Sequence, residues 1–347
     1  MAKLAFTILF VVTSFGVTAQ NTFQEAFNSE TGPYRKDIRI TFTDSQNNRT
    51  FLPISIIKGK NKGPVFTIVA GVHGFEYPPI IAVQRLMQEI RPDNLTGTLI
   101  MIPIASTDSF YSREPFKNAQ DKVNLNRVFP GRRDGSVTEK IADFITTEII
   151  PVSDVFLDVH GGDAPEDLLP YICYYDNRNY PEQTEKAKTL SENSGFEYVV
   201  SYAYTLKDDE PSKYVFKQAC QVGKVALSIE SGKLGNVQEE AIIRIENGVY
   251  RMLEKMGMYE LNIEKSKDKL IRLNNQKYID ADAQGIFYSA FKAGDKVEKG
   301  ETVGYITDEF GKTISELQAP VSGVILYKIA TPPVNIDDTI MCISFAE

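Results

Sequence analysis

The sequence is poor in the residues that mark disulfide-rich or cysteine-dependent proteins. Its 347 residues contain three cysteines, two histidines and no tryptophan. Cys173, Cys220 and Cys342 are too few and too far apart for a disulfide framework, and none is close in sequence to a histidine that could activate it. One pair could form in an oxidising compartment, but an odd count leaves at least one free thiol. We expect small buried side chains and no cysteine nucleophile.

The chain also lacks an excess of positive charge. Lys and Arg number 38 against 46 Asp and Glu, so the formal net charge is −8, whereas nucleic-acid-binding proteins normally present a basic surface. The acidic residues are spread along the chain. The sequence therefore predicts a solvated acidic surface and no nucleic-acid partner.

Long apolar runs are absent after the first twenty residues. Residues 1–19 have the layout of a secretory signal peptide: Lys3 supplies positive charge, residues 4–12 are apolar, and Ala19 ends a small-residue stretch suited to cleavage. A membrane anchor is the alternative, but the apolar stretch is short for a span of about 20 residues. We expect an exported protein, periplasmic or extracellular, whose mature chain has no membrane span.

Apolar runs alternate with helical patterns over residues 22–262. The segment "IRITFTD" (38–44) alternates, and "FLPISIIKG" (51–59) is its expected hairpin partner. Five further runs suit central strands buried on both faces: 65–71, 98–105, 155–161, 198–204 and 224–232. Helices are predicted at 80–90 after two prolines, at 138–150, 181–193 and 211–221, and from about 238 to 256. This order predicts an α/β domain with a mixed, mainly parallel sheet flanked by helices.

The composition changes near residue 265. Residues 265–347 contain short β patterns separated by Gly, Asp and Pro, which predicts a small all-β domain at the C-terminus. The charged stretch "NIEKSKDKLIR" (262–272) is the expected linker.

The segment "VAGVHGFEYPP" (69–79) places one of the two histidines directly after a predicted strand. Gly71 and Gly74 leave the backbone free to turn, so His73 and Glu76 can point at one spot. Imidazole and carboxylate are both zinc ligands, and open α/β sheets bind ligands at the C-terminal ends of their strands. Alone, however, His-x-x-Glu is more often a surface histidine beside a solvated glutamate.

The second histidine occupies the same context. In "VFLDVHGGD", His160 ends another apolar run and is followed by glycine. Together with His73 and Glu76 it would give three protein ligands and leave a fourth position for water, as in catalytic zinc sites. Two imidazoles and a carboxylate favour zinc over other divalent ions. These residues predict one Zn²⁺ per chain.

A zinc hydrolase also needs a general base and a positive group for the oxyanion. Glu230 ends the run "VALSIESG" and suits the first role. Arg127 in "VNLNRVFPG" suits the second, with Asn126 beside it to orient a carbonyl or carboxylate. Each has a simpler interpretation. Glu230 could be a solvent-exposed glutamate at a strand end, and Asn126 and Arg127 could belong to a surface loop with an Asx-type turn. The residues alone leave both interpretations open.

Taken together, these motifs resemble the succinylglutamate desuccinylase/aspartoacylase family, which belongs to the zinc-carboxypeptidase-like group. They follow in the family's order, and the resemblance runs from about residue 50 to the end: His73-x-x-Glu76, Asn124-Leu125-Asn126-Arg127 leading into Phe129-Pro130-Gly131, Asp158-Val159-His160-Gly161, and Glu230. The resemblance implies a zinc-carboxypeptidase-like fold in which His73, Glu76 and His160 hold the zinc.

The resemblance also implies roles for single residues. Glu230 would be the general acid/base, and Asn126 and Arg127 would bind a substrate carboxylate. Arg113, in "SFYSREPF", would polarise the scissile carbonyl, with Arg113 or Arg127 stabilising the oxyanion. The chain departs from the family at Asn124, where aspartate is usual, and in the loop that follows Arg113.

Asp158 belongs to the same motif as His160 and precedes it by two residues. If the strand continues through both, we expect alternation to turn Asp158 to the opposite face of the sheet. We therefore assign it no catalytic role.

The C-terminal segment "GDKVEKGETVG…QAPVSGVI" resembles a biotinyl/lipoyl-like barrel-sandwich fold. Lys312 lies about where a carrier lysine would sit, but Gly311 and Thr313 flank it instead of the residues of true carriers. We expect no swinging cofactor. The domain is expected to cover the mouth of the active site and limit substrate size.

The sequence therefore predicts a zinc-dependent amidohydrolase that deacylates an N-acyl amino acid or a similar small carboxylate. An exported zinc metallocarboxypeptidase acting on peptides or cell-wall fragments is the main alternative, which the predicted export favours. A catalytically inactive binding protein on the same fold is a third, disfavoured because the predicted ligands and base are all present. The expected partners are small N-acyl amino acids or short peptides, and the sequence does not indicate an oligomeric state.

Overall fold

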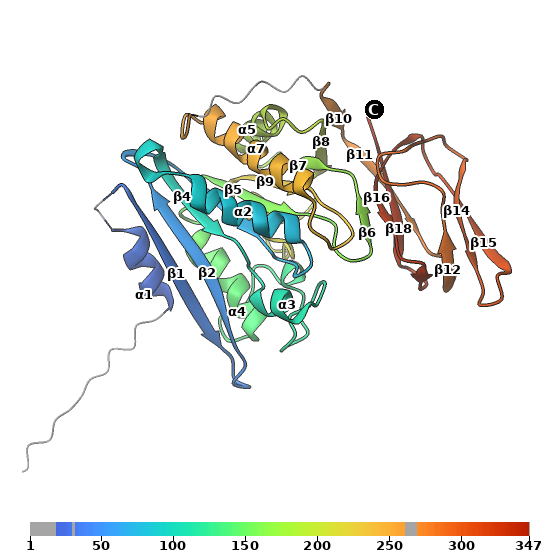
Figure 1. Cartoon of the computed structure of the whole chain (residues 1–347), viewed down its shortest axis with the longest axis horizontal. Coiled ribbons are helices and arrows are strands. Elements are labelled where there is room, and N and C mark those ends of the chain that lie inside the picture. Colours follow the sequence, from blue (N-terminus) through green and yellow to red (C-terminus); the bar gives the residue numbers. More distant parts are fainter. Residues whose placement is uncertain (1–18, 30–31, 261–268, 347) are drawn as a thin grey trace, which may run out of the picture.

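A computed structural model of the chain describes residues 19–29, 32–260 and 269–346 (Figure 1). The predicted signal peptide, apart from its last residue, and residues 262–268 of the predicted linker lie outside this range. No helix among the described residues is long and apolar enough to cross a membrane.

A nine-stranded sheet forms the centre of the larger part, in the order β1-β2-β4-β3-β5-β9-β7-β8-β10. Its strands are β1 (Tyr34–Thr43), β2 (Arg49–Lys58), β3 (Asn61–Ala70), β4 (Thr96–Ile102), β5 (Val155–His160), β7 (Tyr171–Asp176), β8 (Tyr198–Ala203), β9 (Val225–Glu230) and β10 (Ile271–Leu273). β1 and β2 form the predicted antiparallel hairpin. Because β3, β5 and β9 are adjacent and parallel, their C-terminal ends lie at one edge of the sheet.

Helices cover both faces of this sheet, which confirms the predicted mixed α/β class (Figure 1). One face packs against α2 (Tyr77–Glu89), α5 (Pro181–Asn193) and α7 (Glu239–Lys255). The other packs against α1 (Ala19–Phe27), α4 (Val137–Phe144) and α6 (Val215–Gln221). The short helices are α3 (Thr107–Ser112), η1 (Pro92–Asn94), η2 (Leu125–Arg127) and η3 (Ile145–Ile149).

Side-chain alternation along β5 shows how both faces are filled. Val155, Leu157 and Val159 enter the core beneath α2, α5 and α7, and Phe156 enters the core on the opposite face. This two-sided burial is the reason why the predicted central strands have nearly continuous apolar runs.

β7 is not among the strands predicted from the sequence; it lies between β9 and β8 and is antiparallel to β9. Its sequence "YICYYD" carries tyrosine and cysteine where the other central strands carry aliphatic residues. The helix predicted at 211–221 is also shorter than expected, because α6 begins at Val215. All three cysteines are buried and free, as expected.

The C-terminal residues form two small antiparallel sheets around their own apolar core. The strands are β11 (Asn275–Asp280), β12 (Gly285–Tyr288), β13 (Lys296–Val297), β14 (Thr302–Thr307), β15 (Thr313–Gln318), β16 (Gly323–Ile329), β17 (Pro333–Val334) and β18 (Thr339–Phe345). β6 (Glu166–Leu168), from the loop after β5, pairs with β16 and joins this part to the larger one. This all-β arrangement is the one predicted.

Phe156 tests the contribution of the core beneath α1, α4 and α6. It is fully buried, so Phe156→Ala should lower the free energy of unfolding by about 3–5 kcal/mol, because lost burial and an unfilled cavity add. Urea unfolding measures this. Phe310→Ala is the matched control, since Phe310 is 95% exposed and its truncation should change stability by less than about 0.5 kcal/mol. Equal effects would contradict the assignment of the core.

Candidate metal and active site

His73 and Glu76 lie in the turn between β3 and α2. Gly71 has a φ of 63°, in the left-handed region that favours glycine. Gly74 packs so closely on the backbone of Ser109 that a Cβ would lie 2.4 Å from its carbonyl carbon. The two glycines therefore permit the tight path that brings His73 and Glu76 to one spot.

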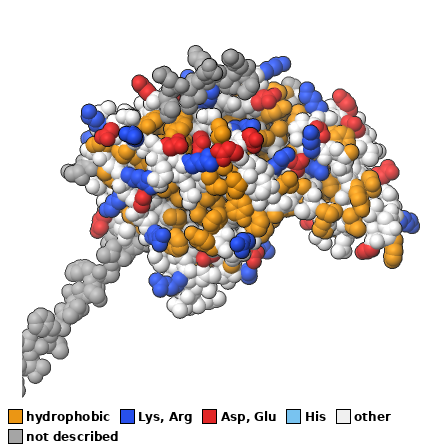
Figure 2. Space-filling view, in the orientation of Figure 1, with side chains coloured by type: hydrophobic (Ala, Val, Ile, Leu, Met, Phe, Trp, Pro, Cys, Tyr) orange, Lys and Arg blue, Asp and Glu red, His pale blue; other side chains and the backbone are white. Residues whose placement is uncertain are grey.

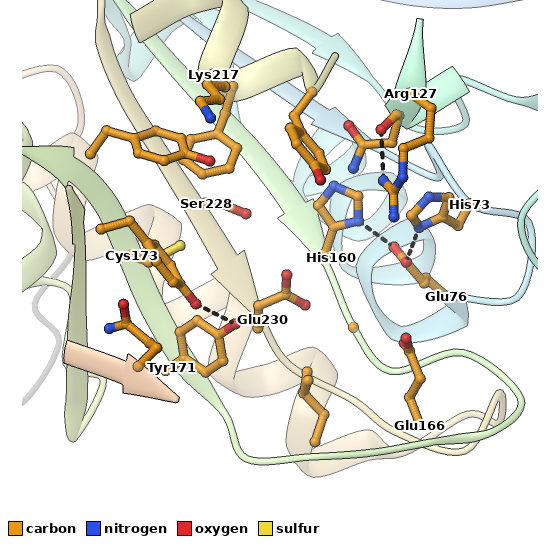
Figure 3. A pocket seen from close by; sticks show the side chains of 18 of the residues that line it. His73, Glu76, Arg127, His160, Glu166, Tyr171, Cys173, Lys217, Ser228 and Glu230 are labelled. Atoms are coloured by element: carbon orange, nitrogen blue, oxygen red, sulfur yellow. Dashed lines mark hydrogen bonds and ion pairs between the residues drawn. The ribbon is translucent and has the colours of Figure 1, made fainter. Parts of the chain in front are cut away.

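Three predicted ligands converge at the C-terminal edge of the sheet (Figure 3). The Glu76 carboxylate contacts both imidazoles, through Oε1 to Nδ1 of His73 at 2.6 Å and through Oε2 to Nδ1 of His160 at 2.8 Å. All three residues are buried, and one ligand atom from each lies within 4.8 Å of the others. The adjacency of β3 and β5 places them together, and the group could bind a metal ion.

Asp158 contradicts the expectation that it turns away from His160. Its Oδ2 lies 2.8 Å from Nε2 of His160. The prediction was wrong because residues two apart in a strand lie on the same face, whereas neighbours alternate. Asp158 is fully buried and orients the imidazole, as carboxylates do for metal-binding histidines.

The hydrogen-bonding pattern fits a cation at this group. Both ring nitrogens of His160 face carboxylates, so without a cation both must carry protons. Burial disfavours that charge, but Asp158 and Glu76 outweigh it and raise the pKa of His160 well above its ordinary value. Burial raises the pKa of Glu76, but the two imidazoles outweigh it and bring that pKa to about 2. A metal ion could replace the Nδ1 proton. His73 also has a buried Nε2 without a hydrogen-bond partner among the described residues.

Glu230 ends β9 and pairs in register with His160 on β5. It lines the same cavity as the histidines. Burial raises its pKa well above the ordinary value, and the neighbouring carboxylates of Glu76, Glu166 and Asp158 add to the shift, although His160 opposes it. A carboxyl group with a raised pKa suits proton transfer near neutral pH.

The segment with Asn126 and Arg127 reaches the cavity from η2. Asn124 caps this turn, because its Oδ1 accepts a hydrogen bond from the Asn126 amide at 2.8 Å. Asn124, which stands where the family usually has aspartate, therefore still accepts a local hydrogen bond. Arg127 lies over the ring of Tyr214, with its guanidinium carbon 4.9 Å from the centroid. Both Asn126 and Arg127 line the cavity.

Arg113 lies elsewhere. It follows α3, has a φ of 54° and is exposed, and it is not among the residues that line the cavity. The structure therefore brings together every predicted site residue except Arg113, whose role stays a prediction.

A cavity of about 590 Å³ extends from the histidines and carries further residues that the sequence analysis did not identify (Figure 3). They are Phe116, Glu166, Leu168, Tyr171, Cys173, Tyr175, Tyr202, Tyr214, Phe216, Lys217, Ser228, Gln276 and Tyr278. The period of two in Tyr171, Cys173 and Tyr175 would have indicated one face of a strand. Gln276 and Tyr278 belong to β11, so the C-terminal part supplies part of the cavity wall.

Comparison with known proteins gives consistent matches. A family profile described as the succinylglutamate desuccinylase/aspartoacylase catalytic domain matches residues 62–256. The N-alpha-acetyl-L-2,4-diaminobutyric acid deacetylase of Halomonas elongata is 28% identical over 311 residues, covering 88% of this chain and 89% of that protein.

Two solved structures share the fold. A succinylglutamate desuccinylase/aspartoacylase from Rhodobacter sphaeroides has a TM-score of 0.80 at 23% identity, covering 90% of this chain and 96% of its own. The product-bound ectoine utilization protein EutE (DoeB) from Ruegeria pomeroyi has a TM-score of 0.79 at 22% identity, covering 90% and 95%. The matched length includes most of both parts of the chain.

The contact between Asp158 and His160 predicts an effect on metal affinity. Asp158→Asn removes the charge that orients the imidazole, so the affinity for added Zn²⁺ should fall about 10–100-fold. Competition with a chromogenic chelator measures this. Asp176→Asn, at the exposed end of β7, is the control and should match the wild type. Equal affinities for both variants would show that Asp158 does not support a metal ligand.

The raised pKa of Glu230 predicts a gain in stability when its charge is removed. As the pH rises above about 4.3, Glu230 ionises in the unfolded chain but not in the folded one, so the wild type loses stability up to the folded pKa. In the presence of chelator, Glu230→Gln should have a higher free energy of unfolding than the wild type at pH 8, and this difference should be smaller at pH 5. Urea unfolding at both pH values measures it. A pH-independent difference would contradict the raised pKa.

Proposed function

The chain belongs to the succinylglutamate desuccinylase/aspartoacylase family, and from this we propose that it is a zinc-dependent amidohydrolase that deacylates N-acyl amino acids. The observation that carries the proposal is the convergence of His73, Glu76 and His160 beside Glu230 in one cavity. The Halomonas relative is named as a deacetylase of an acetylated diamino acid, which supports this reaction class.

Zinc is the proposed metal because the donors are two imidazoles and one carboxylate. His73, Glu76 and His160 would hold it, and Asp158 would keep the His160 ring in place through the contact at 2.8 Å. A bound Zn²⁺ would polarise the scissile carbonyl and lower the pKa of a water molecule.

Glu230 transfers the proton in the proposed reaction. It takes a proton from the attacking water and returns it to the departing amine nitrogen. Its place beside His160 at the end of β9 and its raised pKa both support this role, because a carboxyl group that is readily protonated near neutral pH can also act as the acid.

Asn126 and Arg127 bind the carboxylate of the amino-acid half in this proposal. Arg127 donates to the Asn126 carbonyl and lies over the Tyr214 ring, but it forms no ion pair with a carboxylate among the described residues, so its charge is available to a substrate anion. Arg127 lines the cavity and Arg113 does not, and we therefore assign stabilisation of the oxyanion to Arg127. The predicted signal peptide would place this reaction outside the cytoplasm.

Metal content and turnover test the proposal. We expect about one zinc per chain by elemental analysis, with the metal lost in His73→Ala and His160→Ala, and hydrolysis of N-acyl amino acids by the wild type. Glu230→Gln should keep the metal but lose about 100-fold or more in kcat, because it cannot transfer the proton. Glu309→Gln, at an exposed position, is the matched control.

Three results would overturn the proposal. Preferred hydrolysis of peptides built only of α-amino acids, with a free C-terminus, would indicate a carboxypeptidase. Absence of zinc in the wild type after zinc is added back would exclude the metal mechanism. Unchanged function in Glu230→Gln would indicate a binding protein.

A further inference from the structure

Glu166 is a cavity-lining carboxylate that the proposed mechanism does not use. It is the first residue of β6 and lines the cavity near the two histidines. Figure 3 shows Glu166 on one side of the His73–Glu76–His160 group and Arg127 on the other. If Arg127 binds the carboxylate of the amino-acid half, Glu166 therefore lies toward the acyl half of the substrate.

Glu166 and its neighbour Asp167 differ in their ion pairing. No Lys or Arg lies within ion-pair distance of its carboxylate among the residues that the structure describes, whereas its neighbour Asp167 pairs with Lys233 at 2.8 Å. Both cations that line the cavity, Arg127 and Lys217, lie across it from Glu166 (Figure 3). Asp167 therefore forms an ion pair within the protein, whereas the carboxylate of Glu166 is available to a ligand.

A second carboxyl group, that of Asp163, is buried close to Glu166. Asp163 is fully buried, and neither of its side-chain oxygens has a hydrogen-bond partner among the described residues. Its amide donates to Oε2 of Glu166 at 3.1 Å. Burial raises the pKa of Asp163 to about 9, with Glu166 adding to the shift, and burial also raises the pKa of Glu166. A cation beside them, either a metal ion at the histidines or a substrate ammonium group, would stabilise their ionised forms.

The backbone holds Glu166 in a fixed position. Its amide donates to the Asp163 carbonyl at 3.0 Å, and its own carbonyl accepts from the Leu234 amide at 2.9 Å. β6 pairs with β16 in a register that places Glu166 opposite Ile329. Both parts of the chain therefore hold the backbone of Glu166, so little backbone ordering is needed when a ligand binds.

We propose that Glu166 selects substrates whose acyl chain ends in an ammonium group, so that the preferred class is an ω-aminoacyl amide of an amino acid and not an N-succinyl compound. This inference deepens the proposed function and rests on it. A carboxylate in the acyl half would face Glu166 and Glu230 and be repelled, whereas an ammonium group would form a charge-assisted hydrogen bond with Glu166. In this proposal Glu166 binds the end of the acyl chain and not the reacting atoms, so its effect should appear in KM more than in kcat.

Three substrates of nearly equal shape test the proposal with the zinc-loaded enzyme. β-Alanyl-alanine, N-butyryl-alanine and N-succinyl-alanine differ at the end of the acyl chain, which is positive, neutral or negative. The expected order of kcat/KM in the wild type is β-alanyl, then butyryl, then succinyl. Glu166→Gln should lower the ratio of β-alanyl to butyryl about 10–100-fold, through KM, and raise the relative rate for succinyl.

Two further variants sharpen the comparison. Glu166→Lys should reverse the order of the charged substrates, and the exposed Glu309→Gln should leave the wild-type order unchanged. A wild type that prefers N-succinyl-alanine, or a Glu166→Gln variant that slows all three substrates equally, would overturn the assignment of Glu166.

Binding separates this inference from the proposed function. Calorimetry with the Glu230→Gln variant measures affinity without turnover. If the wild type hydrolyses none of the three compounds, the deacylase proposal fails. The role of Glu166 still stands if the Glu230→Gln variant binds β-alanyl-alanine at least 10-fold more tightly than N-butyryl-alanine and if adding Glu166→Gln removes this preference. Equal affinities, or an absence of binding, would overturn the role of Glu166.

Discussion

The carboxylate of Glu76 joins the two histidines of the chain at one edge of the nine-stranded sheet. It contacts His73 and His160 at 2.6 and 2.8 Å in a buried setting, where an unpaired polar group is costly. The surrounding turn and strand pairing bring these three residues together. The left-handed turn at Gly71 allows β3 to deliver His73 and Glu76, and the parallel pairing of β3 with β5 delivers His160. Asp158 then holds the outer nitrogen of His160.

The cavity next to this group is built by both parts of the chain. β6 leaves the larger part and pairs with β16, while Asp167 bonds Lys233 in the larger part and accepts a hydrogen bond from the Ala293 amide in the C-terminal part. Gln276 and Tyr278 then form part of the wall. The C-terminal part therefore contributes to the cavity, and its expected role in limiting substrate size stays a prediction.

Sequence patterns located the candidate site because strand ends are local features. Apolar runs that end in His-Gly or Glu-Ser-Gly identify where β5 and β9 stop, and parallel neighbours stop at the same edge. The failures had physical reasons too. Asp158 was placed on the wrong face through an incorrect use of strand alternation, and β7 was missed because tyrosines replace its aliphatic residues. The role of Arg113 stays a prediction: it came from a family resemblance in a loop of dissimilar sequence, and Arg113 does not line the cavity.

The sequence by itself determined the α/β class, the glycine turns and the identities of the two histidines and two glutamates. These follow from periodicity and from side-chain chemistry, which act over a few residues. Only the tertiary structure decided that β9 pairs with β7 and β5 and that Asp158 contacts His160. It also decided that, in the described part of the chain, Asp167 pairs with a lysine while Glu166 pairs with no Lys or Arg. Such pairings join residues far apart in the chain, and their energies depend on burial and distance, which a local sequence pattern does not contain.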